Sequence, residues 1–383
     1  MTKKGRLMFS LVRGAMAIGI ALLMTALLVF ISASGETFAE RLAATGDALV
    51  NLLVRPIFKS GGGFSAKNFN DILAGMIPTI FTGLSVCVMF SANQFNMGSE
   101  GGSMLGAFVA ALAAIYLPMA AGLHTAVCLL LGGLAVGLLM VLPGLLKAKL
   151  DVSEMVCTLM LNYVIMYVIK YVLNSHLADK SRGQIMTYPF QETALLPQLV
   201  NDGSKLSWGF VIALVFVVLV TVFMFRTRWG YAIRMIGINH DFAKYSGSHV
   251  GATIVLSQVI GGFLAGLGGG IEMLGRYNTY SWSSLPGYGW TGITIAILAG
   301  NNPAFVPFAA FFMSYLNKGC NLMSVYSGVP SQLIDIIQAV IFLFFAAEQF
   351  LSGYRQKLVV RATQQELKTT ALKAAAKEGT NRG

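Results

Sequence analysis

Residues 208–225 read WGFVIALVFVVLVTVFMF, 18 consecutive residues without a charged side chain. A helix rises about 1.5 Å per residue, so this stretch covers about 27 Å, close to the thickness of the hydrocarbon core of a bilayer. Residues 14–31 form a second apolar run of similar length. Runs of this kind indicate helices that cross a membrane.

The composition of the whole chain supports this interpretation. Of the 383 residues, 56% are hydrophobic and 11% are charged, whereas a soluble domain carries about 25% charged residues. A large soluble α-helical protein is disfavoured because too little polar sequence remains to cover its surface. The alternation of a β-barrel is absent, so a helical bundle is the remaining way to satisfy the backbone in lipid.

We therefore predict an all-α, polytopic transmembrane helical bundle with about ten spans, eight being the lower bound. The eighth and ninth spans are short, which suggests tilted or broken helices. The spans are expected at roughly residues 14–31, 72–90, 103–119, 124–142, 155–173, 208–225, 252–274, 290–302, 305–318 and 332–351.

The distribution of basic residues predicts the orientation of these spans. If residues 1–13 are cytoplasmic, the loops at 143–154 and 226–251 and the tail at 352–383 lie on the same side. These segments hold 17 of the 27 lysines and arginines. Cytoplasmic loops of membrane proteins carry an excess of such residues. Both termini are therefore expected in the cytoplasm, on either side of a transmembrane domain over residues 14–351.

Two further segments near the N-terminus have specific interpretations. A cleaved signal peptide is the alternative for residues 14–31, although the run is long and SASG is a weak cleavage site. Residues 37–55 place several apolar side chains, from Phe38 to Leu53, on one rough helical face. This pattern predicts an interfacial helix on the outer surface of the membrane.

Several classes of site are not expected. The four cysteines and four histidines have no metal-ligand spacing, and no nucleophile constellation stands out, so we predict neither a metal site nor catalytic residues. The motif GxxxxGK[ST] is absent, so no cofactor or nucleotide is expected on this chain. The net charge of +11 is explained by the topology. The expected surrounding is the lipid bilayer, and no nucleic acid partner is predicted.

Glycines recur at a spacing that favours close packing of helices. Gly262, Gly266 and Gly270 follow one another every four residues, as do Gly102 and Gly106. Small residues at this spacing let helix backbones approach each other in lipid. We predict a packing role for these five glycines.

The segment QFNMGSEGG, residues 94–102, is polar and rich in glycine although apolar runs flank it. One interpretation is a plain cytoplasmic loop. The other is an irregular segment inside the membrane, which is tolerated only where protein or a water-filled cavity surrounds it. Asn96 and Glu100 are then candidates for the solute pathway. Asn162 is a third candidate, because an amide in a nearly apolar helix needs a partner; an interhelical hydrogen bond is the equal alternative.

Several stretches resemble a known family. FNMGSEGGSMLGAF at 95–108 resembles the FNIG-x-EGQ segment of permease subunits from bacterial nucleoside and simple-sugar ABC transporters. Further similar stretches follow in the family's order at residues 153–164, 228–247, 257–275 and 287–303. The resemblance, which is to the ribose-permease and branched-chain-amino-acid-permease superfamily, covers most of residues 70–350.

The resemblance implies that separate subunits form the membrane pathway, hydrolyse ATP and deliver the solute. The chain is expected to be a non-enzymatic conduit in the bacterial cytoplasmic (inner) membrane, with residues 14–351 as the permease domain. ATP is hydrolysed by separate ABC ATPase subunits. A second permease subunit, often non-identical, shares the pathway, and an extracytoplasmic solute-binding lipoprotein delivers the solute. Gly102, Ser248 and Thr291 depart from the family pattern, so the solute need not be a standard nucleoside.

The loop at 226–251 is the expected coupling loop to the ATPase. Its pattern is compatible with short helices, and we predict a tight turn with positive φ at Gly237 between them. Arg228, Arg234 and Asn239 complete the candidate coupling residues. An ordinary positively charged loop that only sets orientation is the alternative.

A competing function class is an ion-coupled secondary transporter. Intramembrane acids can relay protons or bind sodium, and the candidates are Glu100, Glu154, Glu272 and Asp335. Capping of helix ends and ion pairing are the simpler roles for these acids. Glu154, after Asp151 and Ser153, resembles a helix N-terminus.

Overall fold

The computed structural model describes residues 19, 23–31, 37–59, 63–179, 183–200, 202–327, 329, 336 and 339. The chain divides into two compact units, Glu36–Pro330 and a smaller unit of Met1–Gly35 with Ser331–Gly383. All regular elements among the described residues are helices. The prediction of an all-α fold is confirmed for this part of the chain.

Six helical segments of the larger unit are long and apolar enough to cross a membrane. They correspond to the predicted spans from 72–90 to 252–274. They are α3 (Ala66–Ser91), α4 (Ser99–Tyr116), α5 (Leu123–Leu139) with α6 (Val141–Leu150), α7 (Glu154–Val172) with the π-helical turn η1 (Leu173–Leu177), α8 (Gly209–Arg226) and α11 (Val250–Arg276).

The predicted eighth and ninth spans form one bent unit. Helix α12 (Tyr288–Leu298) is followed by the 3-10 turn η3 (Pro303–Phe305) and by α13 (Val306–Ser327). The two helical parts are bent by 110° and pass the length and hydropathy criteria only together. Parts of the predicted span 14–31 and nearly all of 332–351 lie outside the described residues, so the count of ten spans stays a prediction.

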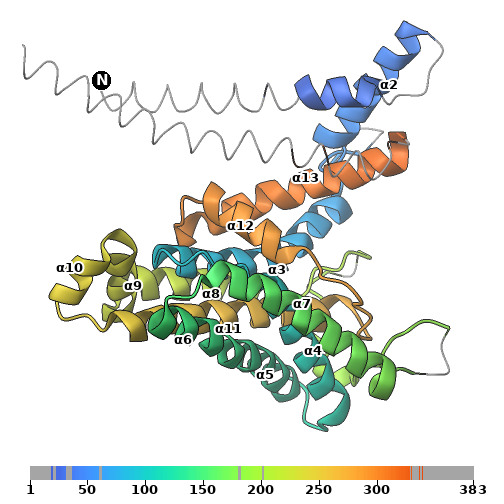
Figure 1. The fold of residues 1–383 in the computed structure, drawn as a ribbon. Coiled ribbons are helices and arrows are strands. Elements are labelled where there is room, and N and C mark those ends of the chain that lie inside the picture. Colours follow the sequence, from blue (N-terminus) through green and yellow to red (C-terminus); the bar gives the residue numbers. More distant parts are fainter. Residues whose placement is uncertain are drawn as a thin grey trace, which may run out of the picture. The chain divides into compact units, whose positions relative to one another are not determined.

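Helix α11 packs against α3, α4 and α5 within the larger unit (Figure 1). The sequence permits this because glycines remove side chains at the crossings. A Cβ atom on Gly106 would overlap the backbone of Gly266, and one on Gly269 would overlap the backbone of Ser103. The contacts of the other predicted packing glycines are also close. A Cβ added to Gly262 would lie 2.5 Å from the side chain of Met140. One added to Gly102 would lie 2.9 Å from Val136, and one added to Gly270 would lie 3.2 Å from Leu129.

Helix α2 (Phe38–Leu53) occupies the segment predicted as an interfacial helix. Thr37 and Glu40 form a capping box that starts it. The side chain of Leu52 is fully buried while that of Phe38 is 72% exposed, because α2 packs along α13. Phe38, Leu42 and Leu53 of the predicted apolar face are exposed, and Leu52 is buried. The interfacial location of α2 stays a prediction.

Helices α9 (Arg228–Ile238) and α10 (His240–Tyr245) lie together in the predicted coupling loop (Figure 1). The prediction of a positive-φ turn at Gly237 is wrong, because this glycine lies inside α9. The break falls at Asn239, whose side chain accepts a 3.0 Å hydrogen bond from the Phe242 N–H and caps α10. Gly237 instead permits close approach, since a Cβ there would overlap the carbonyl of Ser91 at the end of α3.

Candidate functional site

Residues 92–98 connect α3 to α4, and we call them the connector. The connector and the start of α4 follow α7 along two helical turns. The Phe95 N–H donates to the Glu154 carboxylate (3.0 Å), and the Met97 N–H donates to the Thr158 hydroxyl (3.1 Å). One turn further, the Gly101 N–H donates to Asn162 Oδ1 (2.9 Å). Eight residues of helix correspond to about 12 Å, so these contacts follow about 12 Å of a helix that is long and apolar enough to cross a membrane.

This arrangement distinguishes between the two interpretations of residues 94–102. Gln94, Asn96, Ser99 and Glu100 are each at most 2% exposed, which a plain surface loop would not be. Residues 94–98 are irregular and residues 99–102 form the first turn of α4. Protein encloses the polar side chains of this segment, whereas Phe95 is 40% exposed. Polar residues at every fourth position of α7, from Glu154 through Thr158, supply the missing backbone partners. That spacing is the sequence signal for Thr158, which was not predicted from the sequence.

The side chain of Asn162 bonds both the connector and the first turn of α4. Its amide nitrogen donates to the Met97 carbonyl (3.0 Å), while its oxygen accepts from Gly101. The side chain is 2% exposed. Of the two roles considered for this residue, the geometry describes an internal hydrogen bond that holds the N-terminal end of α4.

Asn96 joins the connector to α11. Its side-chain nitrogen donates to the side-chain oxygen of Gln258, and its own oxygen accepts from the Gly98 N–H. Gln258 is fully buried and was not predicted from the sequence. The side-chain nitrogen of Gln258 and the side-chain oxygen of Gln94 form no hydrogen bond within the described residues, so each of these two buried amides has one polar atom without a partner there.

Glu100 caps a second helix. One carboxylate oxygen accepts from the Gly287 N–H and the other from the Gly289 N–H, each at 2.6 Å. These amides form the N-terminus of α12, where a negative charge is favoured by the helix dipole. Two glycines make the approach possible: Gly287 has φ of +83°, and a Cβ on Gly289 would lie 2.5 Å from the Glu100 Cα. Glu100 thus links α4 to the bent α12–α13 unit.

The other acidic candidates are also engaged. Glu154 lies 3.5 Å from the Lys147 ammonium as well as accepting from Phe95. The buried carboxylate of Glu272 accepts from Arg276 at 3.2 Å and from the Tyr288 hydroxyl at 3.1 Å. Asp335 lies outside the described residues. Each of the three described acids therefore has a local structural role.

The α9–α10 pair presents apolar side chains outward. Ile238 is 88% exposed and Tyr245 is 91% exposed, and Phe242 is also exposed, whereas Ile233 and Ile236 are buried. Arg228 is exposed at the start of α9. Arg234 is held by stacking, with its guanidinium 4.9 Å from the centre of the Phe225 ring. We call Ile238, Phe242 and Tyr245 the apolar knob.

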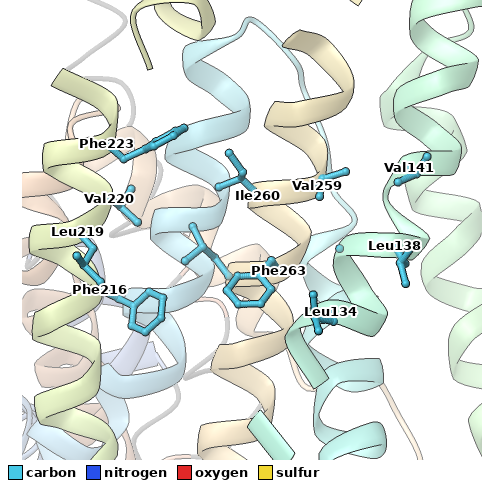
Figure 2. Close-up of a pocket in the computed structure, with 12 residues that line it drawn as sticks. Leu134, Leu138, Val141, Phe216, Leu219, Val220, Phe223, Val259, Ile260 and Phe263 are labelled. Atoms are coloured by element: carbon cyan, nitrogen blue, oxygen red, sulfur yellow. The ribbon is translucent and has the colours of Figure 1, made fainter. Parts of the chain in front are cut away.

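A cavity of about 440 Å³ lies between α5–α6, α8 and α11 (Figure 2). Figure 2 shows Phe216 and Phe223 of α8 opposite Ile260 and Phe263 of α11. The lining is hydrocarbon throughout, so it offers no hydrogen bond to a polar solute. The cavity does not qualify as the solute site.

Comparison with known proteins finds matches over most of the chain. A family model described as branched-chain amino acid transport system / permease component matches residues 68–346. The guanosine ABC transporter permease protein of Bacillus subtilis is 31% identical over 293 residues, covering 75% of this chain and 84% of that protein. The glucose ABC transporter permease protein of Haloferax volcanii is 30% identical over 333 residues, covering 83% and 88%.

A third relative is similar to the same extent. The nucleoside ABC transporter permease protein of Lactococcus lactis is 30% identical over 299 residues, covering 75% of this chain and 81% of that protein. No solved structure matches the chain. The family match begins within α3 and includes the connector and α9–α10. The chain therefore belongs to the family of permease components described as branched-chain amino acid transport system / permease component.

Proposed function

We propose that this chain forms the membrane pathway of an ABC importer for nucleosides or simple sugars, coupled through α9–α10 to a separate ATPase subunit. The relatives are named for guanosine, glucose and nucleoside transport, which supports this solute class. The apolar knob and the exposed Arg228 are the groups that would dock into a cleft of the ATPase.

The observation that carries the proposal is a continuous set of contacts from the knob to the buried network. Gly237 of α9 lies against the backbone of Ser91 and Asn93, where α3 ends and the connector begins. The connector then leads to Glu100, which holds the N-terminus of α12. A displacement of α9 by an ATPase would therefore act on packed groups that reach the bent α12–α13 unit.

The remaining partners follow from the same assembly. A second, non-identical permease subunit would complete the pathway, and an extracytoplasmic solute-binding lipoprotein would deliver the solute at the opposite face of a bacterial cytoplasmic membrane. An ion-coupled secondary transporter is the second candidate. It is disfavoured because the three candidate acids that the structure describes, Glu100, Glu154 and Glu272, are engaged in capping and ion pairing.

Transport in proteoliposomes tests the function. Vesicles containing this chain, its ATPase and its second permease should accumulate labelled guanosine or glucose only with ATP on the ATPase side and the binding protein on the other. A proton or sodium ionophore should leave the rate unchanged. Uptake that continues without ATP and collapses with the ionophore would establish the secondary transporter instead.

Cysteine labelling tests the proposed topology. Lys205 is exposed in the segment between η1 and α8, and Gly379 lies in the C-terminal tail. In intact cells, Lys205→Cys should react with a membrane-impermeant maleimide, whereas Gly379→Cys should react only after the membrane is opened. Reaction of both positions from the same side would refute the ten-span orientation.

A further inference from the structure

Helix α7 carries a row of tyrosines on the side away from the connector. Tyr163, Tyr167 and Tyr171 are 51%, 63% and 66% exposed and follow one another every four residues. They lie about half a turn around the helix from Glu154 and Asn162, which bind the connector. We call these three residues the tyrosine face.

The depth of the tyrosine face is unusual for this residue type. The apolar helical run containing α7 extends over Glu154–Leu177, 24 residues. At about 1.5 Å per residue, Tyr163 and Tyr167 lie within about 4 Å of its middle. Tyrosines commonly gather at the two ends of a span, where their hydroxyls reach the membrane interface. That explanation does not apply to two tyrosines at the centre.

Helix α8 provides an internal comparison. Only 28% of the residues in the apolar stretch of each helix are buried, so both helices leave most of these residues incompletely covered. The large exposed side chains of α8 between Val211 and Phe225 are all hydrocarbon, which suits contact with lipid. The exposed side of α7 instead places its phenols and Lys170 among the exposed apolar side chains of Met160, Val164 and Val168.

Phenols at this depth require hydrogen-bonding surroundings. Buried tyrosine hydroxyls usually find a partner, and an unpaired hydroxyl in hydrocarbon is costly. Among the described residues, the hydroxyls of Tyr163 and Tyr167 form no hydrogen bond, and neither residue has another polar partner. Water in a solute pathway would satisfy them.

We propose that the tyrosine face lines the water-filled pathway and that its rings stack on the base of a nucleoside during passage. The proposal rests on the proposed function and makes the solute class more specific. Aromatic side chains stack on any base, because every base presents a π face. The hydroxyls can in addition bond the ribose. The pathway is thus placed on the side of α7 opposite Asn162.

Single cysteines in the complete transporter test access to this face. Tyr163→Cys and Tyr167→Cys are compared with Val215→Cys and Val218→Cys on α8, in a Cys157→Ala background. A positively charged methanethiosulfonate should modify the α7 positions at least about tenfold faster than the α8 positions, because it reacts with the thiolate, which forms in water. Guanosine during turnover should slow this reaction.

Substitutions that keep or remove the rings give the second readout. Phenylalanine at both Tyr163 and Tyr167 should retain guanosine uptake within about twofold, whereas valine at both should lower it at least about fivefold, the effect of losing one base–aromatic stack. Unaltered uptake in the valine variant would overturn the role in stacking.

Reaction no faster than on α8 would overturn the proposal. Cross-linking to the second permease without reagent access would also overturn it, since it indicates a dry protein interface. ATP-driven uptake by the unsubstituted transporter distinguishes a failure of the inference about α7 from a failure of the proposed function. If that uptake is present, such outcomes refute only the inference about α7; if it is absent, the proposed function itself fails.

Discussion

Gly237→Val is expected to lower uptake and solute-stimulated ATP hydrolysis together by about tenfold or more. Even a single Cβ at this position would overlap the carbonyl of Ser91, and valine adds two further carbons. Forcing extra atoms into a packed contact costs roughly 1–3 kcal/mol. The strain is released most easily if α9 moves away from α3, which separates the apolar knob from the connector.

The measurements are made on the reconstituted transporter, with the bound ATPase quantified by co-purification. Gly251→Ala, at the start of α11, is the control, because its Cβ would meet only the Ala148 side chain at 3.5 Å, an ordinary contact. This control should transport normally. Normal transport by Gly237→Val with its ATPase bound would show that α9 is not the coupling element.

Glu100→Gln is expected to reduce uptake at least about tenfold and to lower the midpoint of thermal unfolding of the purified complex. The carboxylate accepts from two amides of α12 with two oxygens. Glutamine offers one oxygen and turns an N–H group toward the second amide. Hydrogen bonds to a charged group contribute about 1.5–3 kcal/mol each, so α12 would lose its anchor. Glu100→Ala should have a larger effect.

Glu192→Gln is a suitable control, since this glutamate is exposed in the 3-10 turn η2 (Glu192–Ala194) and should leave both quantities unchanged. The pair of measurements distinguishes two roles for Glu100. Lost uptake with an unchanged unfolding midpoint would indicate direct contact with the solute and contradict a capping role. Unchanged values of both would remove Glu100 from the functional network.

The apolar runs and the family motifs were sufficient to predict the membrane-spanning helical class, the six long helices and the permease family. The physical reason is that lipid imposes a requirement on each span separately: every backbone group must bond within the helix, and the side chains must be apolar. A stretch such as residues 208–225 meets that requirement without reference to any other part of the chain. The short eighth and ninth spans were expected to be tilted or broken, and the structure joins them in one unit bent by 110°.

The roles of individual polar residues depended on tertiary structure, because their partners are distant in sequence. Asn162 bonds residues 61 and 65 positions away, and Glu100 caps a helix that begins 188 residues later. No periodicity in the sequence encodes which buried donor lies opposite which acceptor. Gly237 illustrates the same limit: a glycine in a positive-φ turn and a glycine at a helix crossing are identical in sequence, and only the position of Ser91 decides between them.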